Sequence, residues 1–157
     1  GLRVSEASQV FSILGLGTAL GAGCSGLLAG LTGSRFTLVL IYVSGVISLL
    51  LVLLTSKVWV LALAAGLAGV FLMGLVAMTS QRTMEAVGHA KHPKVWGNMT
   101  FAFALGLTVG SNGMSALLQY GQTYLDLFRI GFLIACSGLA LTLFLSCRTL
   151  PSDQQTT

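Results

Sequence analysis

Long apolar runs, separated by short polar or charged stretches, dominate the chain. The runs without a charged residue cover 7–34, 36–56, 58–81, 95–125 and 130–147. An α-helix needs about 20 apolar residues to cross the ~30 Å hydrocarbon core of a bilayer. Each run therefore accommodates one span, and none is long enough for two. The pattern predicts five transmembrane helices, near 8–30, 36–55, 58–79, 97–120 and 127–147.

Composition excludes a soluble domain. Hydrophobic residues make up 55% of the sequence and charged residues only 8%, whereas a soluble surface needs roughly a quarter or more charged residues. The runs are too continuous for the alternating strands of a membrane barrel, and in lipid a helix satisfies its own backbone hydrogen bonds. We therefore expect an all-α integral membrane protein, with the bundle at 8–148, an extracytoplasmic end at 1–7 and a disordered tail at 149–157.

Small residues predict which helix faces pack closely, because they let two backbones approach. In the first helix one side of the helical wheel carries Ser8, Ser12, Gly15, Ala19, Ala22, Gly26 and Gly30. The third helix carries Gly66, Gly69 and Gly74. In the fourth helix Gly106, Gly110 and Gly113 share one side. We expect each of these faces to be a packing face.

The fourth helix also carries a polar stripe opposite its glycines. The stripe consists of Thr108, Asn112, Ser115 and Gln119. Lipid offers such groups no hydrogen-bond partner, so a polar stripe in a span usually faces a bundle interior or a water-filled cavity. The four residues are therefore candidates for lining a solute cavity. Plain hydrogen bonding between neighbouring helices is the alternative.

The longest polar stretch, 80–96, is expected to be a loop, since Pro93 interrupts any helix that runs through it. His89 and His92 lie in this stretch without a carboxylate or Cys to complete a metal site, so we expect no metal and no cofactor. After the fourth helix, Asp126 and Arg129 are spaced to form an ion pair. The cysteines at 24, 136 and 147 have no metal-ligand spacing and are expected to be packing residues.

Basic residues are scattered at helix ends, so the net charge of +4 indicates anchoring at a lipid bilayer and not a nucleic-acid partner. One side of the predicted bundle holds Arg35, Arg82, Lys91, Lys94 and Arg148, and the other holds Arg3, Lys57 and Arg129. The positive-inside rule then places the C-terminal tail in the cytoplasm and the N-terminal end outside.

The turn after the first helix carries a short glycine-basic motif. Gly26, Gly33 and Arg35 match the loop motif of the major facilitator superfamily (MFS) of transporters, which the chain resembles. Gly30 stands where that motif has an Asp, so the charge pairing associated with the carboxylate is not expected. Gly26, Gly30, Gly33 and Arg35 are candidate structural or gating residues.

The resemblance implies the second six-helix bundle of an MFS transporter without its first helix, so that the five spans correspond to helices eight to twelve. It further implies a fragment of a multi-pass secondary active transporter in the plasma membrane, which moves a small-molecule solute by alternating access. Its partner would be the missing N-terminal half of the transporter. Helices eight, ten and eleven line the cavity in that superfamily.

Two other functions are compatible with the residues. A complete five-span protein could act as an assembly or structural subunit, using its small-residue faces as interfaces. The string Gly23-Cys24-Ser25-Gly26 also fits the serine motif of rhomboid-type intramembrane proteases, but that chemistry needs a His base beside the serine. Both His lie outside the spans, so we do not expect an enzyme.

Overall fold

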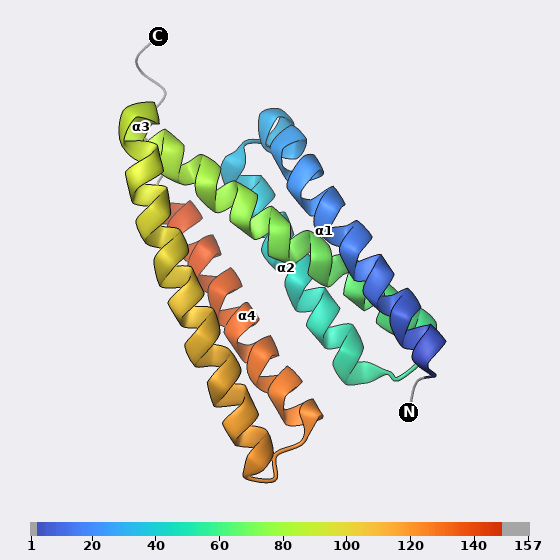
Figure 1. Cartoon of the computed structure of the whole chain (residues 1–157). Helices are drawn as coiled ribbons and strands as arrows, with labels where there is room; N and C mark the ends of the chain where they lie inside the picture. The colour runs from blue at the N-terminus through green and yellow to red at the C-terminus, as the bar shows by residue number, and fades with distance from the viewer. Residues whose placement is uncertain (1–2, 149–157) are drawn as a thin grey trace.

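The computed structural model describes residues 3–148, with side chains described as far as Ser146. Every element in this range is an α-helix: α1 (Val4–Thr32), α2 (Ser34–Leu54), α3 (Val58–Gln119) and α4 (Tyr124–Arg148). All four are long and apolar enough to cross a membrane. The chain runs up and down through the bundle (Figure 1). The expected all-α membrane architecture is therefore confirmed, whereas the expected tail at 149–157 lies outside the described residues.

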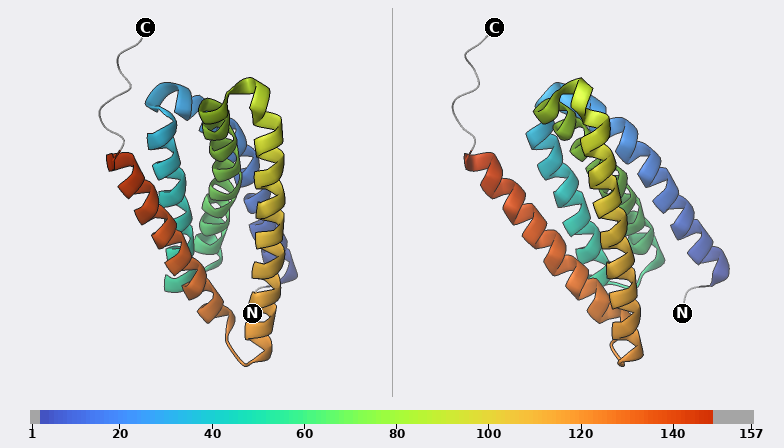
Figure 2. Two further views of the ribbon diagram at one scale, coloured as in Figure 1. Left: turned by 90° about the vertical axis from the view of Figure 1, so that its left-hand side faces the viewer. Right: turned by 60° about the vertical axis from the view of Figure 1, so that its left-hand side comes forward.

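The expected count of five helices is not matched, because the third and fourth spans form one helix. A straight helix of 62 residues would be about 93 Å long, some three times the hydrocarbon thickness of a bilayer. α3 instead bends at Gly88, where φ is 74° and ψ is 164°, a backbone region open essentially only to glycine. The bend divides α3 into a first arm (58–87) and a second arm (89–119), which lie antiparallel (Figures 1 and 2).

The prediction of a loop at 80–96 is wrong, because the helix continues through it on both sides of Gly88. Pro93 lies inside α3, close to the start of the second arm. Pro93 has no N–H, so the second arm lacks the helical bond from position 93 to the carbonyl of His89. The polar residues of this stretch lie around the bend of α3, and they do not mark a loss of helix.

α1 packs on the first arm of α3 through direct backbone contact. A Cβ on Gly21 would lie 2.6 Å from the carbonyl oxygen of Val70, and Gly17 meets the backbone of Gly66 in the same way. The buried face of α1 consists of Gly17, Gly21, Ser25 and Ala29. These residues recur every four positions, so they form one continuous strip along the helix.

The predicted packing face of α1 is wrong for the described chain. Ser8, Ser12, Gly15, Ala19, Ala22, Gly26 and Gly30 are all exposed. A Cβ added at Gly15, Gly26 or Gly30 would meet nothing within 4 Å. α1 has two strips of small residues, and both satisfy the same spacing rule, so only the position of α3 distinguishes them.

The first arm of α3 also packs on α2, as its glycines predict. Gly74 lies against Ile41, and Phe71 lies over Gly45. Ser48 donates a hydrogen bond of 2.8 Å to the carbonyl of Ala64, and both residues are buried. Such a bond is a favourable contact between membrane helices because lipid offers the hydroxyl no alternative.

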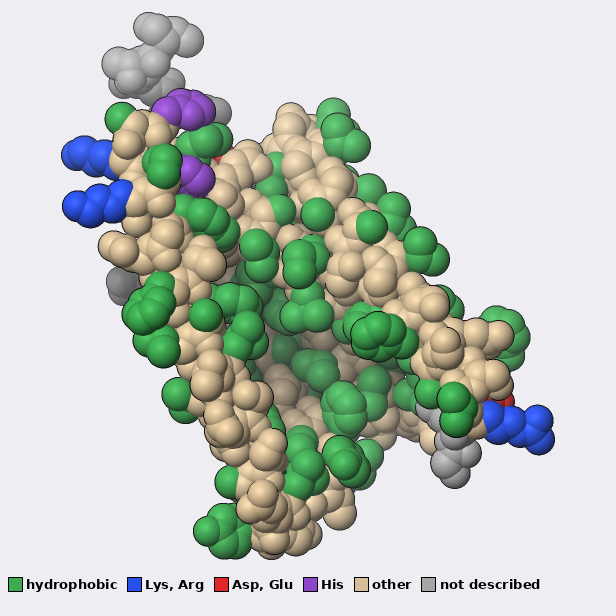
Figure 3. All heavy atoms as spheres, viewed as in Figure 1, with side chains coloured by type: hydrophobic (Ala, Val, Ile, Leu, Met, Phe, Trp, Pro, Cys, Tyr) green, Lys and Arg blue, Asp and Glu red, His purple; other side chains and the backbone are tan. Residues whose placement is uncertain are grey.

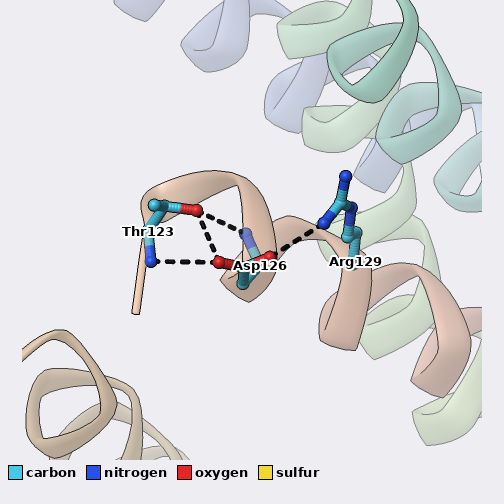
Figure 4. A network of polar contacts seen from close by, with 3 residues as sticks. All are labelled: Thr123, Asp126 and Arg129. Carbon is cyan, nitrogen blue, oxygen red and sulfur yellow. Dashed lines mark hydrogen bonds and ion pairs between the residues drawn. The ribbon is translucent and has the colours of Figure 1, made fainter. Parts of the chain in front are cut away.

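Capping residues extend two helices beyond their expected starts. The Arg3 N–H donates to Glu6 Oε2 at 2.8 Å, so α1 begins at Val4 and most of the expected polar end is helical. At α4, the Thr123 N–H donates to Asp126 Oδ2 at 3.1 Å, and the Asp126 N–H donates to Thr123 Oγ1 at 3.4 Å (Figure 4). This reciprocal cap starts α4 at Tyr124. The predicted ion pair is confirmed, with Arg129 Nη1 2.9 Å from Asp126 Oδ1.

The contact between α1 and α3 predicts opposite effects for two neighbouring glycines. Gly21→Ala forces the two backbones apart and is expected to lower the free energy of unfolding by about 2 kcal/mol. Gly23→Ala meets open space and is expected to leave stability unchanged or raise it by up to about 1 kcal/mol through helix propensity. Unfolding in mixed micelles with increasing denaturing detergent measures both. Equal shifts for the two variants would contradict the observed interface.

The bend at Gly88 predicts different effects for a second pair of glycine-to-alanine variants. Gly88→Ala places a Cβ in a conformation that only glycine adopts easily, and it is expected to destabilise the fold by about 1–3 kcal/mol. Gly97→Ala, in the regular helix of the second arm with nothing within 4 Å, is the matched control and is expected to be neutral or stabilising. The same unfolding assay applies, and a neutral Gly88→Ala would mean that the bend does not depend on glycine.

Candidate functional site

Two chain reversals lie at the same end of the bundle, which we call the Gly88 end (Figure 2). Gly33 separates α1 from α2 with φ 87° and ψ 149°, nearly the conformation of Gly88. Buried Thr37 donates from Oγ1 to the Gly33 carbonyl at 3.0 Å, and its hydroxyl lies 3.2 Å from that of Thr32. The motif glycine at 33 is thus a turn residue that Thr37 braces from the interior.

A polar network joins these two reversals. Ser34 Oγ, at the start of α2, accepts from Arg82 Nη1 at 3.2 Å and donates to Glu85 Oε2 at 3.3 Å. Gln81 Nε2 donates to the other oxygen of Glu85 at 3.2 Å. Ser34 therefore connects the α1–α2 turn to the last turns of the first arm of α3.

Two further contacts hold the arms of α3 together beside the bend. His92 Nε2 lies 3.2 Å from the Ser80 carbonyl oxygen and 3.3 Å from the Ser80 hydroxyl oxygen, so it can bond Ser80 in either tautomer. The Thr83 hydroxyl donates to the Thr79 carbonyl of its own arm at 2.8 Å, and its oxygen lies 3.4 Å from the Met99 sulfur. The His92 ring stacks on Trp96 with 6.2 Å between centroids. Within residues 3–146, no three metal-ligating side chains come together, and His92 serves as a bridge between the arms.

Beyond these contacts the arms diverge around an apolar hollow (Figure 3). The cavity measures about 440 Å³ and is lined by Leu72, Met73, Leu75, Val76, Thr79, Trp96, Met99, Thr100 and Phe103. Two residues of the lining carry a hydroxyl group, and each hydroxyl bonds a carbonyl of its own helix: Thr79 bonds Leu75, and Thr100 bonds Trp96. The wall therefore presents a nearly hydrocarbon surface.

The predicted cavity residues do not line this hollow. At 100° per residue, Thr108, Asn112, Ser115 and Gln119 lie on the side of the second arm opposite the wall formed by residues 96, 99, 100 and 103. All four are exposed. They share one face, as predicted, and that face points away from the first arm.

The hydrogen bonding of this stripe is incomplete. Thr108 Oγ1 donates to the Ala104 carbonyl at 3.0 Å and Asn112 Nδ2 to the Thr108 carbonyl at 2.8 Å. For the side chains of Ser115 and Gln119, the described part of the chain supplies no hydrogen-bond partner. These groups require water, a solute or another protein, because lipid cannot satisfy them.

The glycines of the second arm also have no neighbouring helix against them in the described structure. A Cβ added at Gly106, Gly110 or Gly113 would meet nothing within 4 Å, so the predicted tight packing face is wrong for the described helices. Every residue from 97 to 113 is exposed. Nearer its far end, residues 114 and 116–118 of the second arm are half-buried.

The structure separates the four residues of the loop motif. Gly26 and Gly30 lie on the open side of α1, Gly33 forms the turn, and Arg35 is half-buried in the first turn of α2. Sequence reasoning missed Ser34, Arg82 and Glu85, because the stretch that holds the last two was interpreted as a loop. Continuing the helical spacing to residue 87 would have placed Arg82 and Glu85 on one face, three residues apart.

A comparison with protein families gives one match. The family described as "Uncharacterised MFS-type transporter YbfB" matches residues 4–146, which covers most of the chain. Searches of curated proteins and of solved structures give no match. The match extends over all four helices and includes both the polar stripe and the Gly88 end. The chain therefore belongs to this family of major facilitator superfamily transporters.

Proposed function

We propose that the chain is part of a secondary active transporter that moves a small solute by alternating access, and that the polar stripe of the second arm lines the solute path. The observation that carries the proposal is the exposure of Thr108, Asn112, Ser115 and Gln119 on one face. The stripe offers neutral hydrogen-bonding groups and no charge. A solute that uses it is bound by hydrogen bonds, and any charge on the solute would be neutralised elsewhere.

The unpaired groups of Ser115 and Gln119 support a path filled with water. A polar group that faces hydrocarbon without a partner costs several kcal/mol. A second helical bundle packed against the second arm would enclose the stripe and keep lipid away from it. We propose that the N-terminal half of the transporter is this bundle, and that solute binds between the halves, as in alternating access.

The Gly88 end is the proposed gate. Ser34 bonds both Arg82 and Glu85, so the α1–α2 turn and the α3 bend move as one body while these bonds persist. Breaking them would free the bend from the turn. In this proposal Gly33 and Gly88 supply the conformations of the reversals, and Arg35 anchors the start of α2 at the membrane surface.

The basic residues support an orientation with the Gly88 end in the cytoplasm. Arg35, Arg82, Lys91 and Lys94 lie at or near this end, whereas Lys57 and Arg129 lie toward the other. The excess of basic residues follows the positive-inside rule. We propose on this basis that the protein is a multi-pass protein of the plasma membrane with its N-terminal end outside.

An assembly subunit is the second candidate, and the open strip of small residues on α1 favours it. A strip from Gly15 to Gly30 with nothing against it suits close packing by a further helix. Proteolysis is not a candidate: Ser25 is 3% exposed within the contact with α3, and its hydroxyl donates to the Ala22 carbonyl.

Cysteine labelling tests the solute path. In a background without native cysteines, Asn112→Cys is expected to react with a membrane-impermeant maleimide, because the proposed path carries water to it. Leu133→Cys, exposed on α4 at a similar depth, and Ala140→Cys face lipid and are expected to stay unreacted. Equal protection at all three positions would exclude the path and favour the assembly subunit.

Cysteine labelling at position 83 tests the gate. Thr83 is only 9% exposed and lies in the same part of α3 as Arg82 and Glu85. Ser34→Ala removes the bonds to Arg82 and Glu85, and it is expected to raise the labelling rate of Thr83→Cys about fivefold, the effect of roughly 1 kcal/mol on an opening equilibrium. Ser44→Ala is the control, since the Ser44 hydroxyl bonds only the Ile41 carbonyl of its own helix. An unchanged rate for Ser34→Ala would contradict a gate that depends on Ser34.

A further inference from the structure

Tyr42 lies in the apolar part of α2 and is held by three helices. It is about 12 Å along the helix axis from Ser34, within the candidate span Ser34–Leu54. Its ring meets Phe71 of α3 edge-on, with centroids 5.7 Å apart and planes at 61°. On the other side it lies against Gly138 of α4, where an added Cβ would be 2.7 Å from Tyr42 Cε1. The ring therefore has a defined position between α2, α3 and α4.

The hydroxyl of Tyr42 has no hydrogen-bond partner among the described residues. It is not sealed inside protein either, because no buried side-chain oxygen or nitrogen in this part of the chain is left unpaired. Tyrosine hydroxyls normally find a partner when the ring is buried, and the hydrocarbon region has no water to supply one. An accessible phenol hydroxyl within a membrane span therefore requires a hydrogen-bond acceptor from another molecule.

A cavity of about 490 Å³ lies beside the Tyr42 ring. Its lining comes from α2, α3 and α4: Tyr42, Leu49, Phe71, Leu75, Gly131, Ile134, Ala135, Ser137, Gly138 and Leu141. The volume falls within the roughly 300–1,000 Å³ of small-molecule sites, which are mostly apolar with a few polar groups that fix orientation. Gly131 and Gly138 contribute no side chain to the α4 wall of the cavity.

We propose that this cavity binds a compact, uncharged and mainly apolar molecule that carries one hydrogen-bond acceptor, such as a carbonyl oxygen, for the hydroxyl of Tyr42. The lining contains no charged side chain, so an ionic ligand would lose its hydration without compensation. An acyl chain would fill the volume but leave the hydroxyl unpaired. The site lies away from the polar stripe on the second arm and does not rest on the proposed transport path.

Matched ligands test the role of the hydroxyl. Benzophenone, which carries an acceptor carbonyl and inserts into C–H bonds when irradiated, is used to label the protein in phosphatidylcholine nanodiscs, and the labelled peptides are identified by mass spectrometry. Fluorenone and fluorene, which share one ring system and differ in the carbonyl, then compete with it. For each variant, the fluorenone concentration that halves labelling is compared with the fluorene concentration that does so. All variants are measured in the same nanodiscs, so the different partition of the two compounds into the bilayer cancels when these ratios are compared between variants.

In the natural sequence, label is expected on peptides that contain Tyr42 and 134–141. Tyr42→Phe keeps the ring and is expected to lower the advantage of fluorenone over fluorene about fivefold relative to the natural sequence, the effect of one hydrogen bond. Tyr120→Phe, at a residue that is 86% exposed, is expected to leave the ratio of the natural sequence unchanged.

Two results would overturn the proposal. The same ratio in the natural sequence and in Tyr42→Phe would mean that the cavity takes hydrocarbon alone, as an acyl chain would provide. Absence of label from the lining peptides, with label elsewhere on the protein, would mean that another helix fills the cavity. Stability measured by detergent unfolding verifies that Tyr42→Phe is folded.

Discussion

The conformation of Gly88 determines the arrangement of the rest of the bundle. It brings residues 58–87 and 89–119 side by side (Figure 2), so α3 consists of two helical arms joined at a kink. Because φ 74° and ψ 164° are open essentially only to glycine, the bend has a fixed position in the chain. The hollow between the arms, the bridge from Ser80 to His92 and the outward direction of the polar stripe all follow from that position.

The two arms of α3 differ in how they are held. The first arm is fixed by backbone contact with α1 at Gly17 and Gly21 and by the bond from Ser48. The second arm is exposed throughout 97–113 and is tied to the first chiefly at the bend. α1, α2 and the first arm therefore form a closely packed group, whereas the second arm, which holds the polar stripe, is largely uncovered by the described helices.

The sequence predicts which helix faces are able to pack closely, and the structure shows which helix, if any, packs against each face. The glycines of the first arm were predicted to pack, and Gly66, Gly69 and Gly74 do so against α1 and α2. The glycines of the second arm satisfy the same rule and pack against none of the described helices. A spacing rule identifies surfaces able to approach another backbone, but it carries no information on which helix is near. The same reason explains why the predicted strip of α1 has no partner among the described helices, while the strip of Gly17 and Gly21 does.

The sequence by itself determined the membrane class, the antiparallel course of the apolar segments, the pair formed by Asp126 and Arg129 and the common face of Thr108, Asn112, Ser115 and Gln119. These are local properties, set by hydropathy, by helical periodicity and by residues three or four apart. Only the tertiary structure decided the helix count, the packed face of α1 and the network from Ser34 to Arg82 and Glu85. Each of these depends on the backbone angle at a single glycine or on contacts between residues some 50 positions apart, which no local pattern encodes.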